Sequence, residues 1–317
     1  MSDWTREKLL RRIADVSIWK RGDQRAPHKP LLILYALGKL LEGQNGIRFK
    51  DFYEPFKNLL QEFGPPRKSY HPEFPFWYLR TEGFWEIEPA TGWMTKKRGS
   101  SPSKSDLLDR NAVGRFVPEV QYLLLHDPGL PGEVVSLVLN NHFPDSIHED
   151  ILEATHLEQL QTAKPRRDPR FREEVLRVYG YRCAVCGFDL RLDNAPLALD
   201  AAHIRWHQAH GPSIVSNGLA LCALHHKLFD RGAFSLSDAL TIEVSARVNG
   251  SGGMVEYLTR FNKISIAMPN LRSAKPDLRF IRWHNEEVFH KPVGDWVIGS
   301  AGLSESGSSA LSQMRSV

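Results

Sequence analysis

The chain has 317 residues, of which 42% are hydrophobic and 25% charged, and its formal net charge is +4. This length exceeds one typical domain, so we expect two domains with ordinary cores. There is no apolar run of membrane-spanning length, and charged residues occupy the place of a secretory leader's apolar segment, which predicts a soluble, cytoplasmic protein with no membrane partner. All three cysteines lie in residues 183–222, which leaves none for disulfides elsewhere and fits a reducing compartment.

Helical patterns dominate the first 160 residues. Apolar residues at helical spacing predict helices over residues 9–16, about 30–43, 52–63, about 115–126 and about 132–142, and a polar helix after Pro144. The second of these is apolar all round, with Pro30 in its first turn and Gly43 as a stop. It is therefore expected to be a buried central helix.

The stretch from Tyr70 to Leu79 is rich in aromatic residues and proline. It is too stiff for a helix and too apolar for an idle loop. Trp85 to Ile87 resembles a short strand. The simplest interpretation of the aromatic stretch is a corner of the core, and a binding surface is the alternative.

The second half of the chain opens with a helix start. Asp168 caps the expected helix and Pro169 occupies its first position. The odd-numbered side chains from Leu197 to His203 share one face of an expected strand, and residues 240–244 alternate as another. Together with the first half, these patterns predict an α+β fold.

We expect four segments along the chain. They are a helical domain with a short strand element (1–161), a linker (162–167), a second domain (168–298) and a Ser/Gly-rich disordered tail (299–317).

Two paired motifs indicate a metal site in the second domain. Cys183-x-x-Cys186 is followed by Cys222-x-x-His225. Three thiolates and one imidazole satisfy the tetrahedral preference of zinc and leave no open position, which predicts a structural ion. The bland alternative, three small buried hydrophobic residues, does not explain the two x-x spacings.

A second set of polar residues lies within the same segment. His203, Asn217 and His226 lie 14 and 9 residues apart. Neighbours on a helix point about 100° apart, so His225 and His226 cannot easily serve one ion. In the context Ala-Ala-His203-Ile and Leu-Cys-x-x-His-His226, this set resembles the signature of the HNH, or ββα-metal, endonucleases.

The resemblance covers about residues 171–289 and implies a hydrolase that cuts phosphodiester bonds in DNA. His203 would be the general base, because an ordinary imidazole titrates near neutrality. Asn217 would position the base or its loop, and His226 would hold a catalytic Mg²⁺ or Mn²⁺. Taken singly, each of these residues is more often structural.

One residue departs from the family pattern. Many HNH endonucleases have an Asp or His metal ligand directly before the base, where this chain has Ala202. Asp200 would supply a carboxylate if the strand bulges, and a site completed by waters is the alternative. His207 and His210 are further candidates, although a polar loop explains them as well.

The first half of the chain carries a second resemblance. Arg25-Ala-Pro-His28-Lys29-Pro30 and the stretch from Tyr70 to Trp77 are similar to the sulfur-binding domain of restriction enzymes that attack phosphorothioate-modified DNA. The order of the two domains also matches that family. The implied partner is therefore double-stranded, phosphorothioate-modified DNA.

Sulfur in place of a phosphate oxygen keeps the charge but is larger and less hydrated, so its reader needs cations beside an apolar surface. The expected apolar cup consists of Pro72, Phe74, Pro75 and Trp77. The cations expected to hold the remaining oxygens are Arg25, Lys29 and Arg98. His28 and Tyr70 are expected to reach base edges or the backbone. Basic clusters near residues 20–25, 96–98 and 164–172 are ordinarily solvated surface, but beside a nuclease motif they suit phosphate contacts.

These features predict a zinc-stabilised, Mg²⁺- or Mn²⁺-dependent restriction endonuclease that reads phosphorothioate-modified DNA and cuts near the mark. One HNH site cuts one strand, so double-strand cleavage predicts a homodimer or paired copies. Two alternatives stay open. The first domain would read another modification, such as a methylated base, or the protein would be a zinc-stabilised DNA-binding regulator whose nuclease site has decayed.

Overall fold

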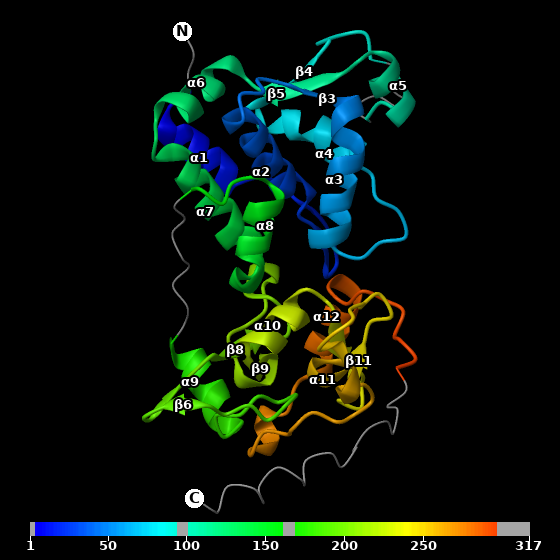
Figure 1. The fold of residues 1–317 in the computed structure, drawn as a ribbon. Helices are drawn as coiled ribbons and strands as arrows, with labels where there is room; N and C mark the ends of the chain where they lie inside the picture. The colour runs from blue at the N-terminus through cyan, green and yellow to red at the C-terminus, as the bar shows by residue number, and fades with distance from the viewer. Residues whose placement is uncertain (1–3, 94–100, 161–168, 297–317) are drawn as a thin grey trace, which may run out of the picture.

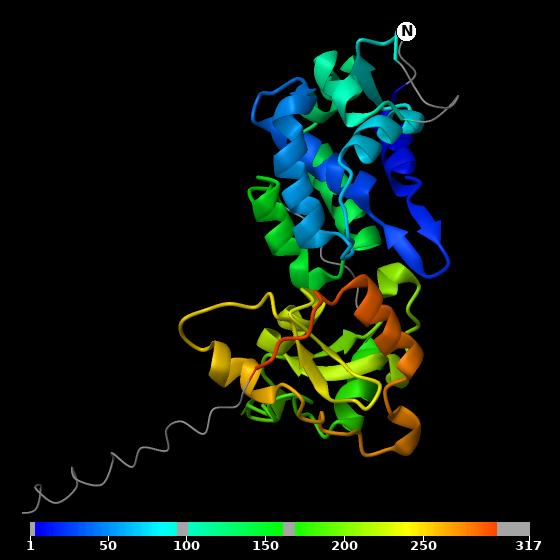
Figure 2. The same cartoon turned by 90° about the vertical axis from the view of Figure 1, so that its right-hand side faces the viewer.

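The computed structural model describes residues 4–93, 101–160 and 169–296. Figure 1 shows a largely helical first body stacked on a mixed second body, and Figure 2 shows the same division from the side. The expected linker (162–167), the expected tail (299–317) and Arg98 lie outside the described residues. Within the described ranges, no helix combines the length and apolarity needed to cross a membrane.

The first body is built from helices around a small sheet. Its elements are α1 (Arg6–Ala14), β1 (Trp19–Arg21), β2 (Gln24–Ala26), α2 (His28–Leu41), β3 (Ile47–Arg48), α3 (Phe49–Phe63), α4 (Glu73–Tyr78), η1 (Leu79–Glu82), β4 (Trp85–Glu88), α5 (Lys104–Asp109), β5 (Val113–Phe116), α6 (Pro118–His126), α7 (Leu130–His142), η2 (Asp145–Ile147) and α8 (His148–Ala154). Strands β3, β5 and β4 form one antiparallel sheet in that order, and β1 and β2 form a separate hairpin.

The predicted central helix is confirmed. Ten of the 14 residues of α2 are buried. One position along it has no room for a side chain, because a Cβ added to Gly38 would lie 1.9 Å from the backbone oxygen of Thr155. The backbone of α2 therefore touches the end of α8 directly, and this contact fixes the position of the segment that leads toward the second body.

The prediction that residues 70–79 form no helix is wrong. Residues Glu73–Tyr78 form α4, with Pro72 at its N-cap and Pro75 in its first turn. Proline is tolerated there because the first-turn N–H groups have no intrahelical acceptor. The helix expected from residue 115 also begins later, at Pro118, because Val113–Phe116 pairs with β4 as the strand β5.

The second body is mixed. Its elements are α9 (Pro169–Val178), β6 (Arg191–Leu192), β7 (Ala195–Pro196), β8 (Leu199–His203), η3 (His207–Ala209), η4 (Val215–Asn217), β9 (Gly218–Cys222), α10 (Ala223–Asp230), β10 (Phe234–Leu236), β11 (Ile242–Val244), α11 (Met254–Tyr257), η5 (Thr259–Phe261), η6 (Arg272–Ala274) and α12 (Leu278–Glu287). The antiparallel hairpin β8–β9 runs directly into α10, which gives the ββα order. Helix α9 lies against this hairpin at Gly218, where an added Cβ would come within 2.4 Å of Val175 Cγ2.

The expected strands of this body are shorter than predicted. Ala198 has a positive φ of 47°, so Leu197 is not on the strand that ends at His203. Leu240 likewise has a φ of 61° and lies in a turn before β11. Strand β8 pairs with β9 in regular register without a bulge, so the position of Asp200 does not depend on one.

The two bodies share an apolar and charged interface. Trp206 and Trp283 of the second body belong to the buried cluster of the first, and their ring centroids lie 5.8 Å apart. Two ion pairs flank helix α10: Arg231 with Glu62 and Lys227 with Asp150, both at 2.7 Å. A third joins Arg67 to Glu287 through both carboxylate oxygens, at 2.9 Å each.

The close contact at Gly38 generates a stability prediction. Gly38→Ala pushes α2 away from α8, and overpacking of this kind costs about 1–3 kcal/mol. We expect the free energy of unfolding of the first body, measured in urea, to fall by about 1–3 kcal/mol. Lys57→Ala, on the exposed side of α3, is the control and should change stability by less than about 0.5 kcal/mol. Equal stability of Gly38→Ala and the wild type would show that the contact is not tight.

Candidate metal centres and nucleic-acid interface

The four predicted zinc ligands converge where β9 ends and α10 begins. Their ligand atoms all lie within 4.8 Å of one another. Cys186 Sγ is 4.0 Å from Cys222 Sγ, and His225 Nδ1 is 3.1 Å from Cys222 Sγ and 3.7 Å from Cys183 Sγ. Tetrahedral zinc with Zn–S bonds of about 2.3 Å places its sulfurs about 3.8 Å apart, so this donor set fits the ion.

His225 is oriented to ligate through Nδ1. Its Nε2 lies 2.9 Å from the backbone oxygen of Tyr257. An acceptor at that position favours a proton on Nε2 and leaves the Nδ1 lone pair toward the sulfurs. In the described parts of the chain, no second group of three or more Cys, His, Asp or Glu ligands is gathered this closely.

His203, the predicted base, is the last residue of β8. Its ring stacks on Phe171 of α9, with 4.0 Å between centroids and 19° between planes, and its Nε2 lies 3.2 Å from Ser213 Oγ. Burial lowers the pKa of His203 to about 4, and the nearby His207 adds to the shift. The imidazole is therefore neutral at physiological pH, but it is a weaker base than the ordinary imidazole expected from the sequence.

Asn217 is fully buried and ties the ends of one loop together. Its Oδ1 accepts from the Arg205 backbone N–H at 2.8 Å, and its Nδ2 donates to the backbone oxygens of Arg205 at 3.0 Å and Pro212 at 2.9 Å. All three bonds are to backbone groups, so Asn217 shapes the loop that follows His203. Of the two roles considered for it, the structure favours positioning of the loop.

His226 points away from the cysteine cluster, as the helical geometry requires. Its Nε2 lies 3.1 Å from Asp230 Oδ2, and its Nδ1 lies 4.0 Å from Asp200 Oδ2. The other oxygen of Asp200 accepts from Arg172 Nε at 3.2 Å and from the Ala201 N–H at 2.9 Å. The regular pairing of β8 therefore brings the Asp200 carboxylate close to His226 without a bulge.

Sequence reasoning missed Asp230. Its carboxylate is 2% exposed and sits beside His226, one helical turn later. Trp206 Nε1 donates to its Oδ1 at 3.0 Å, and the Ser146 hydroxyl donates to its Oδ2. The i, i+4 spacing from His226 was a usable signal, whereas the contact with Ser146, 84 residues upstream, was not visible in the sequence.

The two remaining histidine candidates lie in the loop after β8. The His207 ring lies 6.1 Å from that of His203. His210 Nε2 lies 3.1 Å from Lys20 Nζ on the β1–β2 hairpin. His210 is therefore part of the contact between the two bodies, and His207 borders the candidate base.

Two of the predicted DNA-contacting cations are engaged inside the protein. Arg25 is 5% exposed, donates to the His142 backbone oxygen at 2.8 Å, and has its pKa lowered to about 10 by burial. Lys29 donates to Ser17 Oγ at 2.9 Å and pairs with Glu82. In this conformation Arg25 is withdrawn from solvent, whereas the Lys29 side chain is 12% exposed and paired within the protein.

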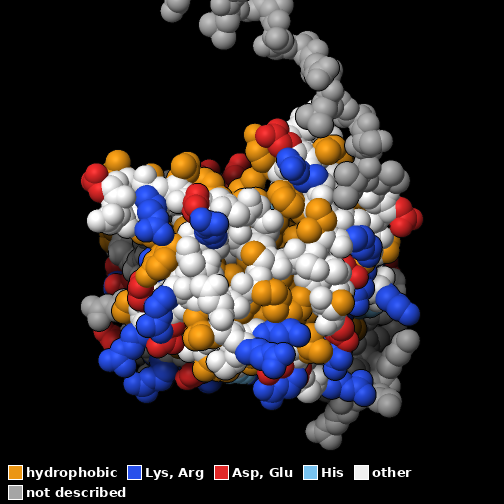
Figure 3. Space-filling model, turned by 90° about the horizontal axis from the view of Figure 1, so that it is seen from below, with side chains coloured by type: hydrophobic (Ala, Val, Ile, Leu, Met, Phe, Trp, Pro, Cys, Tyr) orange, Lys and Arg blue, Asp and Glu red, His pale blue; other side chains and the backbone are white. Residues whose placement is uncertain are grey.

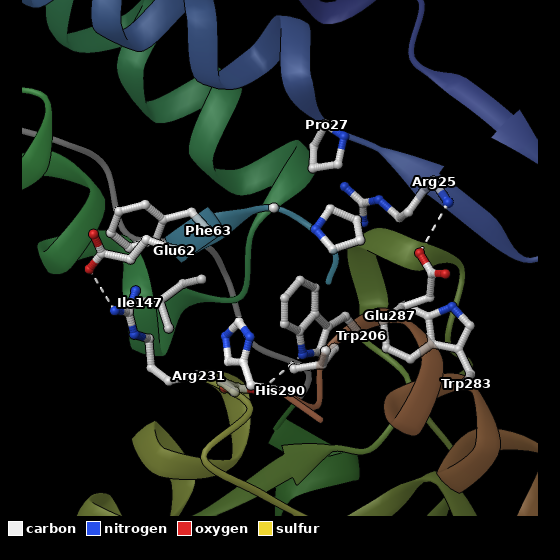
Figure 4. A pocket seen from close by; sticks show the side chains of 14 residues that line it. Arg25, Pro27, Glu62, Phe63, Ile147, Trp206, Arg231, Trp283, Glu287 and His290 are labelled. Carbon is white, nitrogen blue, oxygen red and sulfur yellow. Dashed lines mark hydrogen bonds and ion pairs between the residues drawn. The ribbon is translucent and has the colours of Figure 1, made fainter. Parts of the chain in front are cut away.

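Arg25 also borders a small cavity between the two bodies (Figure 4). Figure 4 shows its side chain across from Trp206, Trp283 and Glu287. The cavity has a volume of about 20 Å³, which is room for about one water and no larger ligand. Glu287 closes it and accepts from the Arg25 backbone N–H at 3.3 Å.

His28 and Tyr70 both lie near Arg67. Burial lowers the pKa of His28 to about 4, with Arg67 and then His71 adding to the shift. The Tyr70 hydroxyl accepts from the Arg67 backbone N–H at 3.2 Å. The structure thus places two of the predicted polar residues beside Arg67, a cation outside the predicted set.

The predicted apolar cup is not an open concavity. Pro72, Pro75 and Trp77 are buried, and Phe74 alone of the four is exposed, at 46%. The Phe74 ring stacks on His71, with 5.1 Å between centroids and 25° between planes. The helix α4, which was not predicted, is the reason: it turns three of these four side chains inward and leaves Phe74 outside.

The second body carries basic side chains near its edges. Figure 3 shows its outer face, where Lys and Arg side chains gather toward the lower part of the view around a centre with scattered hydrophobic side chains. Such an arrangement suits contacts with phosphates around the centre of a face.

Comparison with known families identifies both parts of the chain. The ScoMcrA-like DNA sulfur-binding domain matches residues 6–160, and the HNH endonuclease domain matches residues 183–237. The protein is thus a two-domain chain that joins a DNA-binding domain to a nuclease domain. More particularly, it combines a ScoMcrA-like DNA sulfur-binding domain with an HNH endonuclease domain.

Three solved structures are similar to this chain. The sulfur-binding domain of SprMcrA complexed with phosphorothioated DNA is 22% identical, with a TM-score of 0.44, over 51% of this chain and 100% of that one. The equivalent complex of ScoMcrA is 21% identical, with a TM-score of 0.42, over 48% and 96%. The type IV phosphorothioation-dependent restriction endonuclease ScoMcrA is 21% identical, with a TM-score of 0.40, over 48% and 32%. No curated protein matches the chain.

The cysteine cluster generates a prediction about metal content. Cys186→Ser removes one thiolate from a four-ligand set, so zinc content should fall well below one ion per chain, and the nuclease domain should melt at least about 10 °C lower. Elemental analysis and near-UV circular dichroism measure these changes. His126→Ala is the control, because His126 lies in the first domain, outside the cysteine cluster and outside the His203–Asn217–His226 set. Its zinc content and melting temperature should equal those of the wild type. Full zinc content in Cys186→Ser would exclude this ligand set.

Asn217 generates a second prediction. Asn217→Ala leaves three backbone groups without their partner, and each buried polar group left unpaired costs about 1–3 kcal/mol. We expect the nuclease domain to lose at least about 3 kcal/mol in urea unfolding. Asn249→Ala, at an exposed asparagine with one weak bond, is the matched control and should be nearly neutral. A loss below about 1 kcal/mol would mean that Asn217 does not hold the loop.

Proposed function

We propose that this protein is a modification-dependent restriction endonuclease that binds phosphorothioate-modified DNA and hydrolyses phosphodiester bonds near the mark. One observation carries the proposal: a DNA sulfur-binding domain is joined to an HNH domain in which His203, Asn217 and His226 occupy one ββα unit. The presence of all three residues together favours this proposal over a decayed site.

The side chains of the nuclease domain suit water attack on phosphorus. His203 accepts the proton of the attacking water through its neutral imidazole, the new P–O bond forms, and the bond to the leaving oxygen breaks. Asn217 holds the loop that borders this base. His226 Nδ1 and Asp200 Oδ2 would hold Mg²⁺ or Mn²⁺, which when bound neutralises charge on the phosphate. Zinc in the cysteine cluster would serve only as scaffold.

The accessible part of the reading surface is the Phe74–His71 stack. An exposed apolar ring suits a soft, weakly hydrated sulfur, which loses little hydration when it contacts an apolar surface. Lys68 lies just before this stack in the sequence and would contact phosphate oxygens. Lys29 and Arg25 would support this surface from within rather than touch the DNA.

Binding of matched duplexes tests the reading function. We expect wild-type protein to bind phosphorothioate-modified duplex at least tenfold more tightly than unmodified or methylated duplex at physiological salt. Phe74→Ala should reduce this preference about threefold to tenfold. Tyr122→Ala is the matched control, because Tyr122 is also an exposed ring stacked on a histidine. Equal affinity of the wild type for all three duplexes would refute phosphorothioate reading, and preference for the methylated one would support the alternative reader.

Cleavage of modified plasmid tests the catalytic assignment. With Mg²⁺ or Mn²⁺ we expect nicking by wild-type protein and a loss of about 10²–10⁴-fold in His203→Ala, the range for a general base. His126→Ala should cut like the wild type. Absence of nicking with either ion, or equal rates in His203→Ala, would remove the nuclease function. Because each HNH site cuts one strand, we further propose that two copies act together, with linear product rising more than proportionally with protein concentration.

A further inference from the structure

Asp230 is a buried carboxylate whose neighbours come from three parts of the protein. His226 lies one turn earlier on α10, and Trp206 follows strand β8. Ser146 comes from η2 of the sulfur-binding domain. A carboxylate that is 2% exposed is costly to bury unless donors surround it. The donors gathered around Asp230 therefore indicate a specific role for this carboxylate.

The first contact decides which nitrogen of His226 is open to an ion. Asp230 Oδ2, 3.1 Å from Nε2, favours a proton on that nitrogen. The Nδ1 lone pair is then directed to the side where Asp200 Oδ2 lies 4.0 Å away. A carboxylate behind a ligating histidine fixes its tautomer and ring orientation, and loss of such a partner commonly costs 10–100-fold in metal affinity or activity.

The second contact crosses the domain boundary. Segment η2 of the sulfur-binding domain lies against α10, and its Ser146 hydroxyl donates to the same oxygen, Asp230 Oδ2, that faces His226. The residue after it, Ile147, lines the interdomain cavity together with Trp206 (Figure 4). The ion pairs of Lys227 and Arg231 with the first domain hold α10 in this position.

We propose that Asp230 is a positioning residue for the ion-binding His226, and that Ser146 of the sulfur-binding domain completes it, so that docking of the two domains sets the geometry of the nuclease site. The proposal rests on the proposed nuclease function only for its consequence in cleavage; its consequence for ion binding is independent. Any movement of η2 away from α10 would remove the hydroxyl and loosen the carboxylate that orients His226.

The test uses the zinc-loaded, full-length protein without DNA and titrates Mn²⁺ by electron paramagnetic resonance. Ser146→Ala should weaken Mn²⁺ binding about tenfold, and Ser146→Thr, which keeps the hydroxyl, should restore it. In Asp230→Asn the amide can donate toward Nε2 and so favour a proton on Nδ1, which removes the lone pair, so binding should fall at least 100-fold. Ser136→Ala, at a half-buried serine of helix α7, is the matched control and should bind like the wild type.

Cleavage of modified plasmid is the second readout. Ser146→Ala should lower kcat about tenfold with KM for DNA unchanged, because the sulfur-binding surface is left intact, and raising Mn²⁺ should recover part of the loss. Zinc content and melting temperature near wild-type values separate this effect from unfolding. Mn²⁺ affinity and kcat of Ser146→Ala equal to those of Ser136→Ala, in a protein that does cut, would overturn the inference alone. Protein that binds Mn²⁺ as expected but cuts no DNA would overturn the proposed function alone.

Discussion

The cysteine–histidine cluster is the constraint on which the nuclease domain depends. Cys183 and Cys186 follow helix α9, Cys222 ends strand β9, and His225 lies in the first turn of α10. Bringing these four side chains together fixes where α10 begins and how it is rotated about its axis. Rotation matters because neighbouring residues on a helix point about 100° apart, so placing His225 on the sulfurs directs His226 to a different face, toward Asp200 and Asp230.

The same helix is also the part of the nuclease domain that meets the sulfur-binding domain. Lys227 and Arg231 form ion pairs with acidic residues of the sulfur-binding domain, and Asp230 accepts a hydrogen bond from the Ser146 hydroxyl. One short helix, α10, thus carries a predicted zinc ligand, the candidate ion-binding His226 and the contacts with the sulfur-binding domain. A shift of the first domain is therefore transmitted to the candidate catalytic residues without passing through the cysteine cluster.

At the interface, the nuclease domain contacts Arg25, which the sequence predicts to contact DNA, and Arg67. Glu287 at the end of α12 pairs with Arg67 through both oxygens and accepts from the Arg25 backbone. Burial raises the pKa of Glu287, while the Arg67 guanidinium opposes that shift. A cation paired in this way is unavailable to a phosphate in this conformation, whereas Phe74 and His71 are exposed.

The sequence by itself determined much of the chemistry. The spacing of the cysteines with His225, the His203–Asn217–His226 set and the central helix α2 are local patterns, set by helix and strand geometry and by ligand preference. Tertiary structure decided what depends on distant segments. Prolines 72 and 75 start a helix instead of preventing one, which buries most of the expected cup. Asp200 reaches His226 with no bulge, and Asp230 meets Ser146 from 84 residues away. Such contacts depend on how two domains dock, and pairings across that distance leave no periodicity in a single sequence.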